Sequence, residues 1–315
     1  LPMRSPLMTL TLIKKRIARC QSEARTRQHT RNFSRTCFKR TPIKEKTPGI
    51  IVVAAGTSLP ELASSIEAVI TNHSDIAVGA IVGSNIANII LIMGATALLC
   101  PISGVNQNQI NQSIINIILA FTLIAMSFFL IQFNFVFGFI LFLILIIIMI
   151  LQIKKGTMNF SDVDEKGEYS IFISLILILI GILFLIYGSK YFVGAAVNIA
   201  TIYGVSESVI GATLVAFGTS LPELAVGILS ALRKKVDFAL GNILGSNIYN
   251  VLGVLGITSF FANFSIPSNL GSFDLYIMTG VTILITSFML SFKRLGKTYG
   301  MISLLIYSGY IYFLY

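Results

Sequence analysis

The chain has 315 residues, of which 55% are hydrophobic and 11% are charged, and its mean hydropathy is +0.85. This composition excludes a soluble globular protein and predicts a polytopic membrane protein. Its net charge of +10 comes from residues 1–49, which hold 13 Lys or Arg and 2 Glu, whereas the other 266 residues hold 10 basic and 11 acidic side chains. The basic charge belongs to one terminal segment, so no nucleic-acid partner is expected for the rest of the chain.

Residues 1–49 form a basic, atypical N-terminal segment in which no bilayer-crossing helix is expected. Three interpretations fit this segment: a defective or frame-shifted N-terminus, a basic cytoplasmic tail that contacts anionic lipid headgroups, or an organellar transit peptide rich in Arg and Ser. The abrupt change of composition at Pro48-Gly49 favours the first.

Nine apolar segments follow and are predicted to span the bilayer as helices. They are Ile50–Ile70, Ala77–Leu99, Ile114–Ile131, Val136–Ile153, Ile171–Val193, Val209–Leu232, Phe238–Phe261, Leu275–Phe292 and Met301–Tyr315. We expect an all-α fold in which residues 50–153 form a first membrane repeat, 154–169 a cytoplasmic linker and 170–315 a second membrane repeat.

A duplication links the first two spans to the sixth and seventh. The motif Gly56-Thr57-Ser58-Leu59-Pro60-Glu61 returns 162 positions later as Gly218-Thr219-Ser220-Leu221-Pro222-Glu223. The same offset maps Gly83-Ser84-Asn85-Ile86 onto Gly245-Ser246-Asn247-Ile248, and Asn88 onto Asn250. The two Glu-bearing helices are five spans apart and so cross in opposite directions, which predicts inverted repeats about a pseudo-two-fold axis in the membrane plane.

The charged loops agree with this topology. Every Lys or Arg cluster after the tail falls on one side of the membrane, which the positive-inside rule makes cytoplasmic. These clusters are Lys154/Lys155/Lys166, Arg233/Lys234/Lys235 and Lys293/Arg294/Lys297.

The most informative side chains are Glu61 and Glu223, near the middle of their spans. An ionised carboxylate is costly at that depth, and the repeated helices contain no Lys or Arg to neutralise it. A bound cation therefore explains the pair better than protonated, structural glutamates. Pro60 and Pro222 lack an N–H group, so backbone carbonyls about one turn earlier should be free, in an unwound stretch.

The other polar side chains of the repeats also suit a hard cation. Hydroxyl, amide and carboxylate oxygens are the ligands that calcium prefers, and it takes about 6–8 of them. No single helix readily supplies so many, so the two copies should face each other. The small-xxx-small pairs Gly79/Gly83 and Gly241/Gly245 are expected to bring the second helix of each repeat close to the first.

Enzymatic activity is not expected. An esterase-like elbow needs Gly-x-Ser-x-Gly, and Gly56-Thr57-Ser58-Leu59-Pro60 lacks the final Gly. No cofactor is expected either.

These paired motifs resemble the α-repeats of the calcium/cation antiporter superfamily, in its prokaryotic sodium/calcium exchanger branch, over about Ile51–Tyr315. The resemblance implies ten helices in two inverted halves, one more than the nine predicted here, with the first helix missing. It also implies an ion site whose ligands come from both repeats. These are Glu61, Glu223, Thr57, Ser58, Thr219, Ser220, Ser84, Asn85, Ser246 and Asn247.

The function implied by this resemblance is secondary active antiport in a prokaryotic cell membrane. Calcium would exchange for sodium or protons by alternating access, with the family's first and sixth helices sliding against the core. The alternative is a truncated, non-transporting membrane protein that retains a cation site. The coupling ion, the stoichiometry, the native divalent ion and the oligomeric state stay open.

Overall fold

The computed structural model describes residues 54–155, 171–267, 273–292 and 294–315, all within one compact unit, Lys46–Tyr315. The basic N-terminal segment, the first residues of the first predicted span and most of the predicted linker lie outside the described residues.

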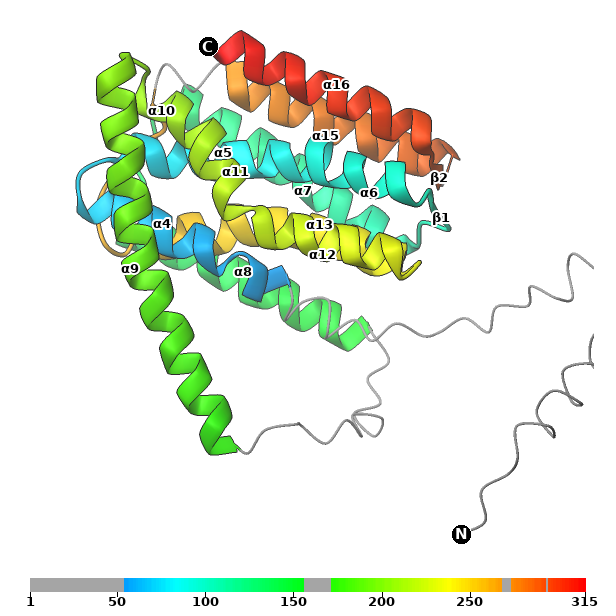
Figure 1. The fold of residues 1–315 in the computed structure, drawn as a ribbon, viewed down its shortest axis with the longest axis horizontal. Helices are drawn as coiled ribbons and strands as arrows, with labels where there is room; N and C mark the ends of the chain where they lie inside the picture. Colours follow the sequence, from blue (N-terminus) through cyan, green and yellow to red (C-terminus); the bar gives the residue numbers. More distant parts are fainter. Residues whose placement is uncertain (1–53, 156–170, 268–272, 293) are drawn as a thin grey trace, which may run out of the picture. The chain divides into compact units, whose positions relative to one another are not determined.

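The described residues form two successive sets of helices (Figure 1). In the first set, a helical turn at 54–57 precedes α4 Leu59–Ile70, α5 Ser74–Ala87, the π-helical η1 Asn88–Ile92, α6 Met93–Leu99, α7 Gln107–Phe128 and α8 Phe135–Lys155. The second set contains α9 Ile171–Tyr203, α10 Glu207–Ile210, the π-helical η3 Gly211–Val215, α11 Ala216–Thr219, α12 Leu221–Leu232, α13 Val236–Tyr249, the π-helical η4 Asn250–Val254, α14 Leu255–Thr258, α15 Phe273–Phe292 and α16 Lys297–Leu314. The bounds of α4 and α12, of α5 and α13, and of η1 and η4 are 162 positions apart, so the duplication extends to local structure.

Each of the nine predicted spans corresponds to a helical stretch in the described part of the chain. Five of these stretches are long and apolar enough to cross a membrane by themselves, and a sixth is the bent pair Glu207–Thr219 and Leu221–Leu232. The other three predicted spans correspond to α4, α9 and α16.

The central helices are those that carry the duplicated motifs. The apolar window of Ser74–Leu99 is 94% buried and that of Val236–Thr258 is 83% buried, whereas that of Phe135–Gln152 is only 17% buried. The mixed polar and apolar sequence of the central pair is therefore enclosed by protein, and the apolar stretch of α8 that precedes Gln152 is left to face lipid.

The predicted proline breaks are present, but each is confined to one residue. Ser58 (φ −86°, ψ 10°) and Ser220 (φ −84°, ψ 7°) separate two helical segments, and the second pair is bent by 46°. Ser58 N–H still bonds to Ala54 O at 3.3 Å, and residues 54–57 and 216–219 are helical. The expectation of an unwound stretch before each proline was therefore wrong. The N–H donor that each proline lacks changes the backbone at one residue only, where the helix kinks.

The two repeats exchange their last helices. The helix α16 packs against α6 of the first repeat, and α8 packs against α14 of the second. A Cβ atom on Gly300 would lie 2.7 Å from Gly94 O, and one on Gly138 would clash with Gly256 O, the position equivalent to Gly94. Only glycine allows the helices to approach so closely.

Short backbone pairings repeat the same exchange at the helix ends. The strand β1 Ile102–Ser103 pairs antiparallel with β2 Arg294–Leu295, with Ile102 opposite Leu295. The equivalent residues, Phe133 and Phe264, form an isolated bridge. Reciprocal pairs of this kind are what the predicted two-fold relation between the repeats produces.

The glycine pairs of the second helices approach a different partner from the one expected. Cβ atoms on Gly79 and Gly83 would clash with the backbone of Ser208 and Ala212, in α10 and η3 of the other repeat. A Cβ on Gly245 would lie 3.2 Å from the Cβ of Ala54, which precedes α4. The expectation that these glycines bring each second helix onto the first helix of its own repeat was wrong for Gly79, Gly83 and Gly245, since the exchanged packing places the other repeat's broken helix against them.

Candidate cation site

The two kinked residues face the carboxylates of opposite repeats. Ser58 Oγ donates to Glu223 Oε1 at 3.1 Å, and Ser220 Oγ donates to Glu61 Oε1 at 3.1 Å. Each serine is held in place by the proline break and each glutamate by the first turn of the following helix. The structure therefore brings the duplicated motifs together into one symmetric site.

Both carboxylates are fully enclosed. Glu61 is 1% exposed and Glu223 is 0% exposed, and the second oxygen of each, Oε2, has no hydrogen-bond partner. Among the described residues, no Lys, Arg or His side chain lies within ion-pairing distance of either carboxylate. Two buried acceptors that lack donors are expected to be compensated by a cation.

Two buried asparagines of the duplicated helices also have side-chain oxygens without a hydrogen-bond partner. Asn88 and Asn250 are 0% exposed, and their Oδ1 atoms have no hydrogen-bond partner. Their amide nitrogens are engaged, because Asn88 Nδ2 donates to Asn247 Oδ1 at 2.8 Å and Asn250 Nδ2 donates to Asn85 Oδ1 at 3.4 Å. These bonds leave the Oδ1 of Asn88 and of Asn250 as the free acceptor of each side chain.

The asparagines predicted from the sequence are close by but hold other bonds. Asn247 Nδ2 donates to the backbone oxygen of Asn85 at 3.2 Å, and Asn85 Nδ2 lies 3.8 Å from Met278 Sδ. Their side-chain oxygens already accept hydrogen bonds from Asn88 and Asn250. In this arrangement Asn85 and Asn247 orient the other two asparagines.

The remaining predicted ligands are all hydroxyl residues in the same region. Ser246 Oγ donates to Glu223 Oε1 at 3.4 Å, and Ser84 Oγ accepts from Asn250 Nδ2 at 3.0 Å. Thr219 is buried and Thr57 half-buried, and each hydroxyl also bonds to the helix backbone three or four residues earlier.

Asn88 and Asn250 were not assigned a role from the sequence, although the repeat offset relates them to each other. The signal that could have identified them is the spacing Ser84–Asn88 and Ser246–Asn250, which places hydroxyl and amide one turn apart on the same helix face. Each of these asparagines also begins a π-helical segment, a deviation that is frequent at functional sites.

The described residues contain no group of three or more His, Cys, Asp or Glu side chains that could hold a metal ion. The candidate site therefore depends on two carboxylates surrounded by neutral oxygens, a set that suits Na⁺ and Ca²⁺ and not thiophilic metals.

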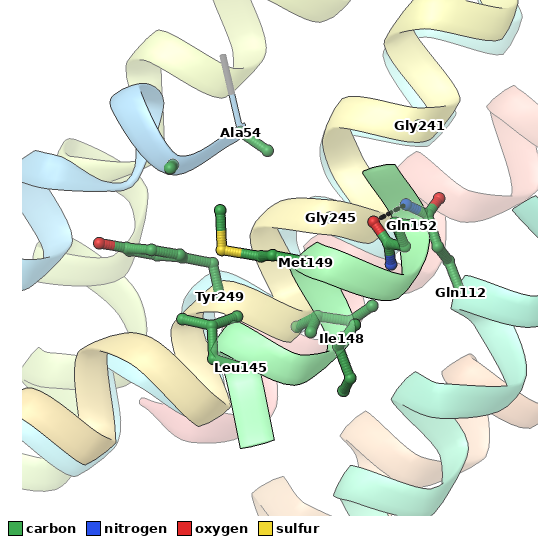
Figure 2. Close-up of a pocket in the computed structure, with 11 residues that line it drawn as sticks. Ala54, Gln112, Leu145, Ile148, Met149, Gln152, Gly241, Gly245 and Tyr249 are labelled. Atoms are coloured by element: carbon green, nitrogen blue, oxygen red, sulfur yellow. Dashed lines mark hydrogen bonds between the residues drawn. The ribbon is translucent and has the colours of Figure 1, made fainter. Parts of the chain in front are cut away.

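A small cavity adjoins the second helix of the second repeat (Figure 2). It has a volume of about 30 Å³, enough for a water molecule. Gly241, Gly245 and Tyr249 of α13 form one wall, and the amides of Gln112 and Gln152, from α7 and α8, form another. Gly245 and Tyr249 directly precede Ser246 and Asn250, so the cavity lies beside the helix segment that carries these two residues.

Comparison with known proteins identifies a family. A family model described as "Sodium/calcium exchanger protein" matches residues 30–154 and 173–315. A membrane protein of Methanocaldococcus jannaschii is 34% identical over 259 residues, which cover 82% of this chain and 83% of that protein. The sodium/calcium exchanger MaX1 of Methanosarcina acetivorans is 29% identical over 325 residues, which cover 89% of this chain and 91% of that protein.

The fold is also similar to a solved structure. The sodium-calcium exchanger NCX_Mj, soaked with 2.5 mM Na⁺ and 1 mM Sr²⁺, superposes with a TM-score of 0.64 and 31% identity, covering 84% of this chain and 85% of that one. Together with the apolar helices described above, these similarities show a multi-pass membrane protein with an all-helical exchanger fold.

Proposed function

The chain belongs to the sodium/calcium exchanger family, and we propose that it is a secondary active antiporter that exchanges calcium for sodium by alternating access. The observation that carries this proposal is the pair of buried carboxylates, Glu61 and Glu223, each with one oxygen that has no hydrogen-bond partner. Two ionised carboxylates carry a combined charge of −2, which one Ca²⁺ or sodium ions would neutralise. Calcium and sodium can therefore use the same site in turn.

The proposed ligands come from both repeats. The Oε2 atoms of Glu61 and Glu223 and the Oδ1 atoms of Asn88 and Asn250 are free acceptors. Hydroxyl or carbonyl oxygens of Thr57, Ser58, Thr219, Ser220, Ser84 and Ser246 complete the set. We assign Asn85 and Asn247 to positioning, since their side-chain oxygens already accept hydrogen bonds.

The moving part that we propose is α9. This helix contacts α4, α10 and η3, and many of its large apolar side chains are exposed, including Phe184, Tyr187 and Tyr191. A helix that contacts the core along a limited surface can slide with little repacking, whereas the central helices cannot. This assignment agrees with the family-level expectation that the sixth helix slides.

The test is calcium uptake by proteoliposomes. Vesicles loaded with sodium and diluted into sodium-free medium should take up radiolabelled calcium, and collapse of the sodium gradient should abolish the uptake. In a parallel set of vesicles, a pH gradient replaces the sodium gradient, and little uptake is expected there. Uptake driven by the pH gradient alone would show that protons, and not sodium, are the coupling ion.

The matched variants are Glu223→Gln and Asp274→Asn. Asp274 is also a buried carboxyl group, 3% exposed, but its partner is Tyr310 Oη at 2.8 Å and it lies outside the site. Uptake should be lost in Glu223→Gln and retained in Asp274→Asn. Full gradient-driven uptake by Glu223→Gln would contradict the proposal.

A further inference from the structure

A large hollow lies between α15 and α16, away from the cation site. It has a volume of about 820 Å³, within the range of about 300–1,000 Å³ that is typical of sites for small organic molecules. Leu284, Phe288 and Phe292 of α15 form one wall and Ile302 and Ile306 of α16 the other. The two helices lie side by side near the C-terminus, with β2 between their ends (Figure 1).

The walls of this groove are apolar and open to the surroundings of the bundle. Leu284 is 48% exposed, Phe288 39% and Ile302 52%. A hydrocarbon chain that occupied the groove would cover these side chains. An apolar wall alone does not select one lipid from another, because every lipid has such chains.

Two basic side chains at one end of the groove could distinguish an anionic lipid from a neutral one. Arg294 in β2 and Lys297 at the start of α16 both line it and are both exposed. The groove has no Asp or Glu among its described lining residues, and no carboxylate there lies within ion-pairing distance of either cation. Both cations are therefore available to an anionic partner.

The same end of the groove presents backbone donors. The helix α16 begins after Gly296, which provides no side-chain cap. The first N–H groups of an uncapped helix lack intrahelical acceptors and favour an anion such as a phosphate. The pairing of Arg294 with Ser103 of β1 holds this end of the groove in place.

The pseudo-symmetry of the chain shows that the fold does not require these cations. The offset of 162 positions relates Arg294 to Gln132 and Lys297 to Phe135, at the turn between α7 and α8 on the opposite side of the membrane. That turn makes the equivalent backbone bridge without either charge. The charged pair is thus an addition to one side, the side that the positive-inside rule makes cytoplasmic.

We propose that this groove binds an anionic phospholipid of the cytoplasmic leaflet, with its phosphate at Arg294 and Lys297 and an acyl chain between α15 and α16. Basic pockets between transmembrane helices on the cytoplasmic side bind headgroups of this class. The bound lipid would connect α15 to α16, whose N-terminal half packs on α6 beside the central helices.

The experiment is native mass spectrometry of the purified full chain, titrated with phosphatidylglycerol or with phosphatidylcholine of the same acyl composition. The wild-type protein should prefer phosphatidylglycerol. The double variant Arg294→Gln/Lys297→Gln should bind it roughly 10- to 30-fold more weakly, because each basic residue near the surface contributes a few-fold in affinity. The control Lys234→Gln/Lys235→Gln removes two exposed charges on the same predicted side and should retain the preference.

A second variant tests the apolar part without altering the charge. Ile302→Trp fills the groove with an exposed, bulky side chain and should reduce phosphatidylglycerol binding several-fold, and soluble glycerol phosphate should not displace the lipid. The proposal is overturned if the double variant keeps the wild-type preference, or if both double variants lose it equally. Complete displacement by glycerol phosphate would also overturn it, since that would indicate an anion site with no lipid chain.

Discussion

The carboxylate that distinguishes this site most clearly is Glu223, and its replacement by Gln is the sharpest test of calcium binding. The substitution keeps an oxygen that can accept the hydrogen bonds from Ser58 and Ser246, which reach Oε1 at 3.1 and 3.4 Å. It removes the charge and the free Oε2. The fold should therefore be retained while the cation loses one of its two anionic ligands.

The expected magnitude follows from ligand linkage. Calcium at about 100 times its Kd stabilises the native state by about 2.7 kcal/mol, which is about 4 °C in Tm for a chain of this size. Loss of one buried charged partner costs about 2–5 kcal/mol of binding, so the affinity should fall at least roughly 30-fold. At the same calcium concentration the variant should gain less than about 1 kcal/mol.

The assay is thermal unfolding of the purified protein with and without calcium. Asp274→Asn is the control, because it neutralises a buried carboxyl group outside the site and should preserve the calcium-induced shift. By the reciprocal geometry, Glu61→Gln should behave like Glu223→Gln. An unchanged calcium shift in Glu223→Gln would refute the assignment of this carboxylate as a ligand.

Three further outcomes are expected. Asn88→Ala and Asn250→Ala should each weaken calcium binding about 10-fold, since each removes one free oxygen ligand; isothermal titration with an unchanged Kd would exclude that role. Gly300→Ala should destabilise the protein by about 1–3 kcal/mol, because its Cβ would meet backbone of α6, whereas Gly309→Ala, with open space around it, should stabilise by about 0.5–1 kcal/mol. Equal melting temperatures for these two variants would contradict the close approach of α16 to α6. Asn242→Ala should leave the melting temperature unchanged or raise it, because both amide atoms of this 0%-exposed side chain lack partners; a lower value would reveal a stabilising contact.

Much of this protein can be predicted from its sequence, because the decisive signals are the hydropathy of each segment and a repeated motif. Length and hydropathy identify the membrane-spanning segments, and the 162-residue offset identifies the repeat down to the bounds of α4 and α12. The two glutamates are recognisable because a carboxylate inside an apolar span needs compensation wherever its partner lies. The sequence therefore predicts which motifs hold the site, and the structure brings the two carboxylates of these motifs into contact with Ser58 and Ser220.

The tertiary structure decided how these motifs combine. Ser58 contacts Glu223 and not the glutamate of its own motif, and α16 packs on α6 of the other repeat. These contacts join residues more than 160 positions apart in the chain, and periodicity carries no information about them. The same holds for the amides: whether Asn85 or Asn88 has a free oxygen depends on which partner, from the other repeat, engages each side chain. Hydropathy and spacing determine which residues enter the membrane core, but only the direction of each side chain in the packed bundle determines which oxygen is left for an ion.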